Sequence, residues 1–237
     1  MSQIEVDGVT VTVVRRKIKS LNLYVKPPDG RVQVSAPMRT SDRAIRGFVQ
    51  AHIAWVHRQQ ARIRDCCPRH AYQSGETISV FGKPYVLLCT PAATKRACGA
   101  ALEADRLVLA SCPDSTAEQR EEILRRWQRD QLKTLAAELI AQWEGRMGVR
   151  VSTWHIKRMK TKWGSCNFRA HRIWLNLSLA EQPVECVEYV VVHELCHLLE
   201  PSHNERFWAL MTQYLPDWKA RRTRLNAAPK KPDAALP

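Results

Sequence analysis

The chain has 237 residues, 45% of them hydrophobic, and a formal net charge of +14 at pH 7. This length allows one large domain or two small ones around a buried core, and the lack of any run of about 18 apolar residues argues against a membrane span. The charge leaves nucleic acid open as a partner, because Lys and Arg neutralise phosphates, but the basic residues are spread along the whole chain, as on a generally basic surface.

The start of the chain alternates between apolar and polar residues, as strands do. Residues 4–14 predict two strands around the Asp7-Gly8 turn, and residues 21–26 and 31–36 predict a hairpin closed by Pro27-Pro28-Asp29-Gly30. No internal repeat is evident in the sequence. These signals indicate a small β-rich region.

A helix is expected next, from a cap at Thr40 or Ser41 to about Arg64. Strand character returns at 76–90 and again at 106–110. The helix carries apolar residues at helical spacing, and we expect these to face inward: Ile45, Phe48, Val49, Ile53 and Val56. The first half is therefore predicted to be β-rich with one helix.

The second half begins with a long helix, expected from about 116 to 146. Ser115 is the predicted N-cap, because Glu118 follows at the spacing of a capping box, and Gly148 is the predicted end. Shorter elements are predicted after it: a β segment at 150–158, a turn-rich stretch at 162–171, a strand at 172–177, a helix with Pro183 in its first turn, and a last helix at about 204–226 interrupted or bent at Pro216.

Residues 193–197 read His-Glu-Leu-Cys-His and carry the strongest chemical signal in the chain. A helix advances about 100° per residue, so His193 and His197 lie one turn apart on the same face. Two imidazoles so placed can hold one zinc ion, and Glu194 between them can hold a water molecule against it. The flanks favour a buried helix that ends at a proline: Val187, Val190, Val191, Leu195 and Pro201.

The cysteines and the N-terminus bear on the compartment. The opening MSQIEVDG lacks the basic and apolar regions of a secretory signal. The 8 cysteines are irregularly spaced, and Cys66 and Cys67 are adjacent, which suits no ordinary disulfide. We therefore expect reduced thiols and a cytoplasmic protein.

Several separated blocks resemble the YgjP-like metallopeptidases. The blocks are KRMKTKWGSC (157–166), YVVVHELCHLLEPSHNERFW (189–208) and YLPDWKARR (214–222), with RRKIKSLNLYVKPPDGRVQVSAP (15–37), Trp55 and FGKPY (81–85) matching nearer the N-terminus. The resemblance spans about residue 10 to 226 and implies an α+β fold with a zincin-like core, similar to that of the SprT-like proteases.

The resemblance also implies a domain plan and a zinc site. It divides the chain into a β-rich N-terminal region at 1–114 and a zincin-like catalytic core at 115–226. Residues 227–237 are rich in Ala, Pro and Lys, and this composition predicts a disordered tail. The core comprises a long helix, a small sheet, the active-site helix and a C-terminal helix. The residues that match the family's site are His193, His197 and His203 as zinc ligands and Glu194 as the general base. Cys196 occupies a small-residue position of the motif.

The third ligand is the least constrained part of this site. His203 follows His197 at the interval found in metzincins, but Glu200 stands where those enzymes place a glycine, so the helix must end differently. A downstream carboxylate, Glu205 or Asp217, is the alternative ligand.

The chemistry that these residues permit is zinc-dependent hydrolysis of peptide bonds in a protein or peptide substrate. Zinc lowers the pKa of its bound water to about 7, and Glu194 would take the proton as that water attacks a peptide carbonyl. A second donor to the oxyanion is expected, with His171, Arg172 and Tyr214 as candidates. The hypothesis is thus a zinc metalloendopeptidase.

A second hypothesis is a basic nucleic-acid-associated protein, either a binding module with a structural zinc or a protease linked to DNA, by analogy with SprT-like proteins. Trp163, beside Lys162, is the tryptophan we would test for substrate contact, whereas Trp174 and Trp208 are expected in the core. No membrane partner is expected.

Overall fold

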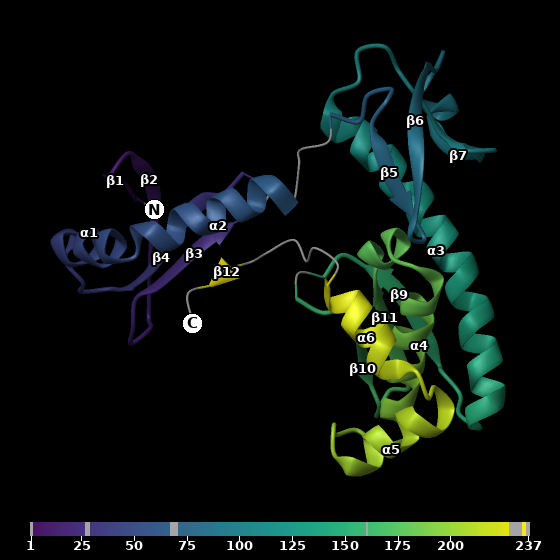
Figure 1. The fold of residues 1–237 in the computed structure, drawn as a ribbon. Coiled ribbons are helices and arrows are strands. Elements are labelled where there is room, and N and C mark those ends of the chain that lie inside the picture. The colour runs from purple at the N-terminus through teal and green to yellow at the C-terminus, as the bar shows by residue number, and fades with distance from the viewer. Residues whose placement is uncertain (1, 27–28, 67–70, 160, 228–233, 236–237) are drawn as a thin grey trace. The chain divides into compact units, whose positions relative to one another are not determined.

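The computed structural model describes residues 2–26, 29–66, 71–159, 161–227 and 234–235 (Figure 1). The chain forms two compact units, the first made of Met1–Arg69 with Pro229–Pro237 and the second of His70–Ala228. The predicted α+β class is confirmed, since helices and three separate small sheets share the chain. None of the helices in the described ranges is long and apolar enough to cross a membrane.

The first unit is built on a sheet in the order β1-β2-β4-β3-β12. Its strands are β1 (Ser2–Val6), β2 (Val9–Arg16), β3 (Asn22–Lys26), β4 (Arg31–Pro37) and β12 (Ala234–Ala235). Strands β2 and β4 are parallel, and the other pairs are antiparallel. Both predicted strand pairs are confirmed, whereas Pro27 and Pro28 of the second turn, and residues 228–233 and 236–237 of the predicted tail, lie outside the described residues. Ala234 and Ala235, predicted as part of a disordered tail, instead pair with β3.

Two helices share a core with this sheet, where the sequence predicted one. Helix α1 (Asp42–Ala51) is capped by the predicted Ser41, whose side chain accepts a hydrogen bond from a backbone N–H of the first turn. It ends at His52, whose ring donates to the carbonyl oxygen of Phe48 at 2.8 Å, and α2 (Ile53–Cys66) starts immediately after it. The five residues predicted to face inward are all buried or packed against the core, as expected.

The second unit begins with a sheet in the order β5-β6-β8-β7. Its strands are β5 (Thr77–Val80), β6 (Lys83–Pro91), β7 (Gly99–Glu103) and β8 (Arg106–Ser111), with the short 3-10 helix η1 (Lys95–Ala97) before β7. The connections repeat those of the first unit: two hairpins whose second strands, here β6 and β8, run parallel at the centre. This repeated topology is not visible as a sequence repeat. A β-strand requires apolar residues at alternate positions, but it does not require the same apolar residues in both units.

The packing of helix α3 (Ala117–Met147) accounts for the position at which the chain divides into two units. Its N-terminal part packs on this second sheet through Leu124, which shares a core with Leu87 and Leu107. The compact units therefore divide between residues 69 and 70, whereas the sequence placed a boundary between 114 and 115. The local sequence pattern of the strands does not reveal that their sheet packs against the helix that follows them.

The ends of α3 are defined by its caps. Thr116 is the N-cap and Gln119 completes the capping box, so the predicted Ser115 and Glu118 pair is wrong by one residue. Gly148 ends the helix, as predicted, in the left-handed conformation with φ 65°, which glycine adopts without steric cost.

A three-stranded sheet in the order β10-β11-β9 and three helices complete the unit. The elements are β9 (Thr153–Lys157), β10 (Gly164–Asn167), β11 (Arg172–Asn176), the 3-10 helix η2 (Leu177–Glu181), α4 (Val184–Leu199), α5 (Glu205–Tyr214) and α6 (Trp218–Ala227). Strand β10 lies within the stretch predicted as turns, because its residues GSCN carry little β-propensity. The predicted break near Pro216 is confirmed, and Pro183 is the N-cap of α4.

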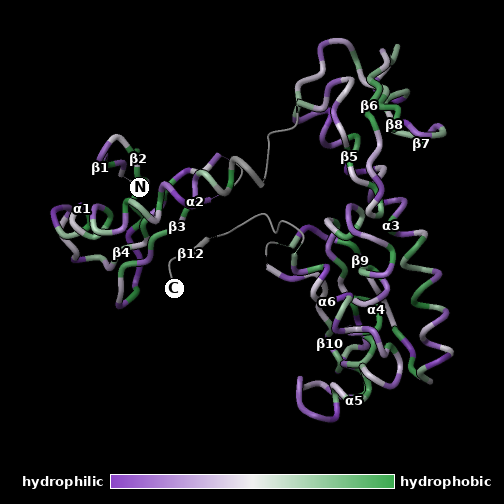
Figure 2. The backbone as a smooth tube through the Cα atoms, viewed as in Figure 1, coloured by the Kyte–Doolittle hydropathy of each residue, from purple (hydrophilic) through white to green (hydrophobic). Residues whose placement is uncertain are grey.

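Helix α4 lies at the centre of the largest core cluster, and the four apolar residues predicted to be buried before and within its motif are all buried. Figure 2 shows hydrophobic and hydrophilic positions mixed along the elements, as expected where each element buries one face. Trp208 packs against this core as predicted, and Trp163 does so too. Trp174 is not among the residues of this cluster, because Ile173 and Leu175 on either side of it take the inward face of β11.

Candidate metal centre

Helix α4 presents two histidines on one face, and the chain then turns back to add a third. The helix ends at Leu199, and the cap residue Glu200 has extended backbone at φ −145°. Pro201 follows, so the helix cannot continue. Asn204 then caps α5 by accepting a hydrogen bond from the N–H of Phe207. The short connection between the two helices carries His203 back toward the motif.

The three imidazoles converge. One ligand atom from each of His193, His197 and His203 lies within 4.8 Å of the others, and this is the group of potential metal ligands found among the described residues. The Nε2 atoms of His193 and His203 are 3.0 Å apart, close to the separation of about 3.3 Å expected for two nitrogens on one tetrahedral zinc ion. The ring of His197 is oriented by its Nδ1, which lies 3.3 Å from the carbonyl oxygen of Glu200.

A fully buried phenylalanine supports all three rings. The centroid of Phe207 lies 4.9 Å from that of His193, 4.7 Å from that of His197 and 4.7 Å from that of His203. Trp208 stacks on His203 with a centroid distance of 5.6 Å and an interplanar angle of 23°. Two consecutive aromatic residues of α5 therefore hold the third histidine, which lies in a loop and is itself exposed.

The environment disfavours protonation of these imidazoles. Burial lowers the pKa of His193 to about 3, with further repulsion from His197 and His203. Burial also lowers the pKa of His197 and of His203. Neutral imidazoles have a free lone pair, which is the form that binds a metal ion.

The donor set fits a divalent transition metal. Three neutral nitrogen donors suit zinc, which commonly takes three protein ligands in catalytic sites. The buried Nδ1 of His193 has no hydrogen-bond partner among the described residues, whereas its Nε2 faces the Nε2 of His203. The carboxylates considered as alternatives are not in the group, and Asp217 instead pairs with Arg221 at 2.8 Å.

Glu194 is a buried carboxyl group beside this cluster. Its side chain is only 4% exposed, and burial raises its pKa to about 8, an effect opposed by the nearby charge of Lys162. Strand β10 packs directly against it: a Cβ added to Gly164 would lie 2.8 Å from the Cγ atom and 2.9 Å from the Cδ atom of Glu194. The glycine of the WGSC block therefore leaves the space that the carboxyl group occupies.

Asn176 positions the segment that carries Lys162 and Gly164. This buried side chain donates to the carbonyl oxygens of Met159 and Lys162 at 2.8 and 2.7 Å, and it accepts from the N–H of Met159 and of Ser178. Its role was missed in the sequence, because an asparagine at a strand end is the usual cap of the turn that follows.

The candidates for a second oxyanion donor have other partners in the structure. His171 lies in a turn, with Nδ1 3.0 Å from the carbonyl oxygen of Arg150. Arg172 donates to the hydroxyl of Thr153 at 3.0 Å, and Tyr214 packs against the core. Within the described ranges, no hydrogen bond or ring contact joins any of them to the three histidines, whereas Arg222 acts electrostatically on His193 and His203.

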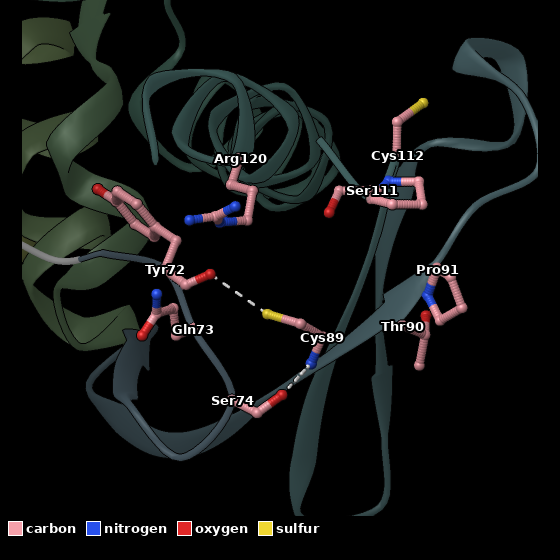
Figure 3. Close-up of a pocket in the computed structure, with 10 residues that line it drawn as sticks. Tyr72, Gln73, Ser74, Cys89, Thr90, Pro91, Ser111, Cys112 and Arg120 are labelled. Carbon is pink, nitrogen blue, oxygen red and sulfur yellow. Dashed lines mark hydrogen bonds between the residues drawn. The ribbon is translucent and has the colours of Figure 1, made fainter. Parts of the chain in front are cut away.

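A separate hollow of about 230 Å³ lies at one end of the β5–β8 sheet (Figure 3). Its wall is held by Cys89, whose backbone N–H donates to the hydroxyl of Ser74 and whose thiol donates to the carbonyl oxygen of Tyr72. None of the three histidines lines it, so it is distinct from the candidate metal centre.

Replacing His203 tests the third ligand. We expect His203→Ala to lower the zinc content of the purified protein to well below one ion per chain, because two imidazoles alone bind zinc weakly. Asp217→Asn should leave zinc content unchanged, since that carboxylate pairs with Arg221. Elemental analysis after gel filtration gives both values. If His203→Ala kept all of its zinc and Asp217→Asn lost it, Asp217 would be the third ligand instead of His203.

The buried histidine also predicts how the metal-free protein responds to acid. The pKa of His193 in the folded protein is about 3, below its ordinary value of 6.5. As pH falls through this range, His193 is therefore protonated in the unfolded chain but not in the folded one. We expect the stability contributed by neutral His193 to be lost progressively below about pH 6.5. Thermal unfolding of chelator-treated protein between pH 7 and 4.5 should show a steeper loss than in His193→Asn. If the unfolding temperature falls equally steeply with pH in both proteins, His193 is not the cause of the acid sensitivity.

Comparisons with known proteins identify a family for most of the chain. The family model described as YgjP-like, metallopeptidase domain, matches residues 19–228. No curated protein matches the chain significantly. Two solved structures are similar to it. The metallopeptidase zymogen abylysin of Pyrococcus abyssi is 21% identical with a TM-score of 0.36, covering 38% of this chain and 90% of its own. The zymogen jannalysin of Methanocaldococcus jannaschii is 21% identical with a TM-score of 0.33, covering 40% and 93%.

Proposed function

The chain belongs to the YgjP-like metallopeptidase family, and on that premise we propose that it is a zinc-dependent endopeptidase. In this proposal the zinc ligands are His193, His197 and His203, and the general base is Glu194. The observation that carries the proposal is the convergence of three imidazoles together with a buried carboxyl group, Glu194, on the helix that carries two of them.

The number of donors supports a catalytic site over a structural one. Structural zinc sites are closed by four protein ligands, whereas catalytic sites keep one position open. Within the described part of the chain the group has three members, all histidines. A structural site also has no use for Glu194, because a buried carboxyl group that is not a ligand only adds a desolvation cost.

Glu194 is suited to proton transfer. When bound, zinc would act as a Lewis acid toward a water molecule and the peptide carbonyl. A nearby cation favours the ionised carboxyl group, so the pKa of Glu194 would fall from about 8 toward the neutral range. In this range Glu194 can accept a proton from the attacking water and return it to the leaving amine.

The test is a proteolysis assay with the full chain and a fluorescently labelled unfolded protein such as casein. We expect cleavage that stops on treatment with a chelator and returns on addition of zinc. Cleavage of a peptide blocked at both ends would identify an endopeptidase. Adding duplex DNA to the same assay tests the nucleic-acid partnership that the net charge of +14 leaves open. Cleavage that is indifferent to chelation would contradict the proposal.

A further inference from the structure

Helix α6 carries three arginines, and one of them differs from the others. Arg221 pairs with Glu188 and Asp217, and Arg224 pairs with Glu185. Arg222 has no carboxylate partner among the described residues, although it lies on the same short helix. Its guanidinium therefore keeps its full charge and its hydrogen-bond donors free.

Arg222 is held in place by an aromatic stack. Its guanidinium carbon lies 5.3 Å from the ring centroid of Trp208. Trp208 in turn stacks on Trp218, with a centroid distance of 4.6 Å and an interplanar angle of 17°, and on His203. An aromatic face attracts a guanidinium without neutralising it. The same indole thus orients both the third histidine and an unpaired cation.

The positive charge of Arg222 acts on two of the three histidines. It adds to the lowering of the pKa of His193 and His203, where burial is the largest cause. The charge that acts on Glu194 instead comes from Lys162. Arg222 thus lies on Trp208, which stacks on His203, whereas Glu194 lies against Gly164 of strand β10.

A free guanidinium beside a cation-binding site repels the metal ion and attracts an anion. Carboxylates and developing oxyanions form strong, charge-assisted hydrogen bonds with arginine, especially where the guanidinium is already oriented. Resting on the proposed peptidase function, we propose that Arg222 binds an anionic oxygen of the substrate next to the metal. That oxygen is either the oxyanion developing on the scissile carbonyl or a free carboxylate of the peptide.

The test compares Arg222→Gln with Lys219→Gln. Lys219 lies on the same helix and stacks on Trp218, the other tryptophan of the stack, at 5.7 Å, so both variants remove one cation. Zinc affinity is measured by competition with a chromogenic chelator, and binding of inorganic phosphate to the zinc-loaded protein by calorimetry. We expect Arg222→Gln to bind zinc severalfold more tightly and phosphate at least tenfold more weakly, with Lys219→Gln close to wild type.

Cleavage kinetics separate the two sources of the anion. A fall in kcat of about 10²-fold on blocked peptides assigns Arg222 to the oxyanion. A rise in KM confined to peptides that end in a free carboxylate assigns it to that group, and Arg222→Lys should recover part of either loss. Looser zinc binding or unchanged phosphate binding in Arg222→Gln would overturn the inference. If the wild-type chain cleaves no peptide but binds phosphate through Arg222, the peptidase proposal fails and the anion site stands.

Discussion

Glu194→Gln is expected to lower the rate of peptide cleavage by about 10³-fold, as the loss of a general base does, while zinc content stays at the wild-type level. Glutamine keeps the size and shape of the side chain that packs against Gly164, but it cannot accept the proton from water. The measurement is kcat on labelled casein together with elemental analysis of the same preparation. Cleavage at the wild-type rate would remove Glu194 from the mechanism.

The same variant should be more stable than wild type when both are metal-free. Burial raises the folded pKa of Glu194 from 4.5 to about 8, so the unfolded carboxyl group ionises in a pH range where the folded one does not. This costs stability as pH rises from about 4.5 to 8, at up to about 1.4 kcal/mol for each unit of pKa difference. We expect Glu194→Gln to raise the Tm by several degrees at pH 8 and by almost nothing at pH 4. An equal increase in Tm at pH 8 and pH 4 would mean that the ionisation of Glu194 is not its cause.

Gly164→Ala is expected to cause the second large loss, although residue 164 is neither a ligand nor an acid or base. The new methyl group would lie within 3 Å of the Cγ and Cδ atoms of Glu194, and overpacking of this kind costs about 1–3 kcal/mol. The carboxyl group is the part that can move. We therefore expect kcat to fall by about 10²-fold, since small displacements of a catalytic group have effects of this size, with zinc still bound.

Gly145→Ala is the matched control. Its added Cβ meets nothing within 4 Å, and at this position in the last turn of α3 alanine is a better helix former than glycine, by at most about 1 kcal/mol. This control should cleave casein at the wild-type rate and unfold at an equal or higher temperature. If Gly164→Ala cleaves as well as the control, the close packing of β10 on Glu194 has no part in catalysis.

The second half of the chain was largely predictable because its signals are local. The spacing of His193 and His197 and the apolar positions of α4 follow from helix geometry, and the structure places them as expected. The convergence of His203 with them agrees with the resemblance, but spacing alone could not distinguish it from Asp217. What distinguishes them in the structure is Phe207, whose buried ring contacts all three imidazoles.

The parts that could not be predicted depend on contacts distant in sequence. The packing of Gly164 on Glu194, the hydrogen bonds of Asn176 and the approach of Arg222 to the histidines each join segments separated by many residues. A glycine, an asparagine and an arginine have common local roles in turns, caps and surfaces, so their positions in the sequence do not identify these contacts. The division of the compact units near residue 70 likewise depends on such contacts, because it follows from the packing of α3 on the β5–β8 sheet.

The most direct test of the metal centre is elemental analysis of the purified full chain beside the variant His193→Ala/His197→Ala. The account predicts one zinc ion per chain in the wild-type protein and almost none in the variant, with circular dichroism confirming that the variant is folded. A wild-type chain that carries no metal even after incubation with zinc, or a folded variant that retains the ion, would contradict it.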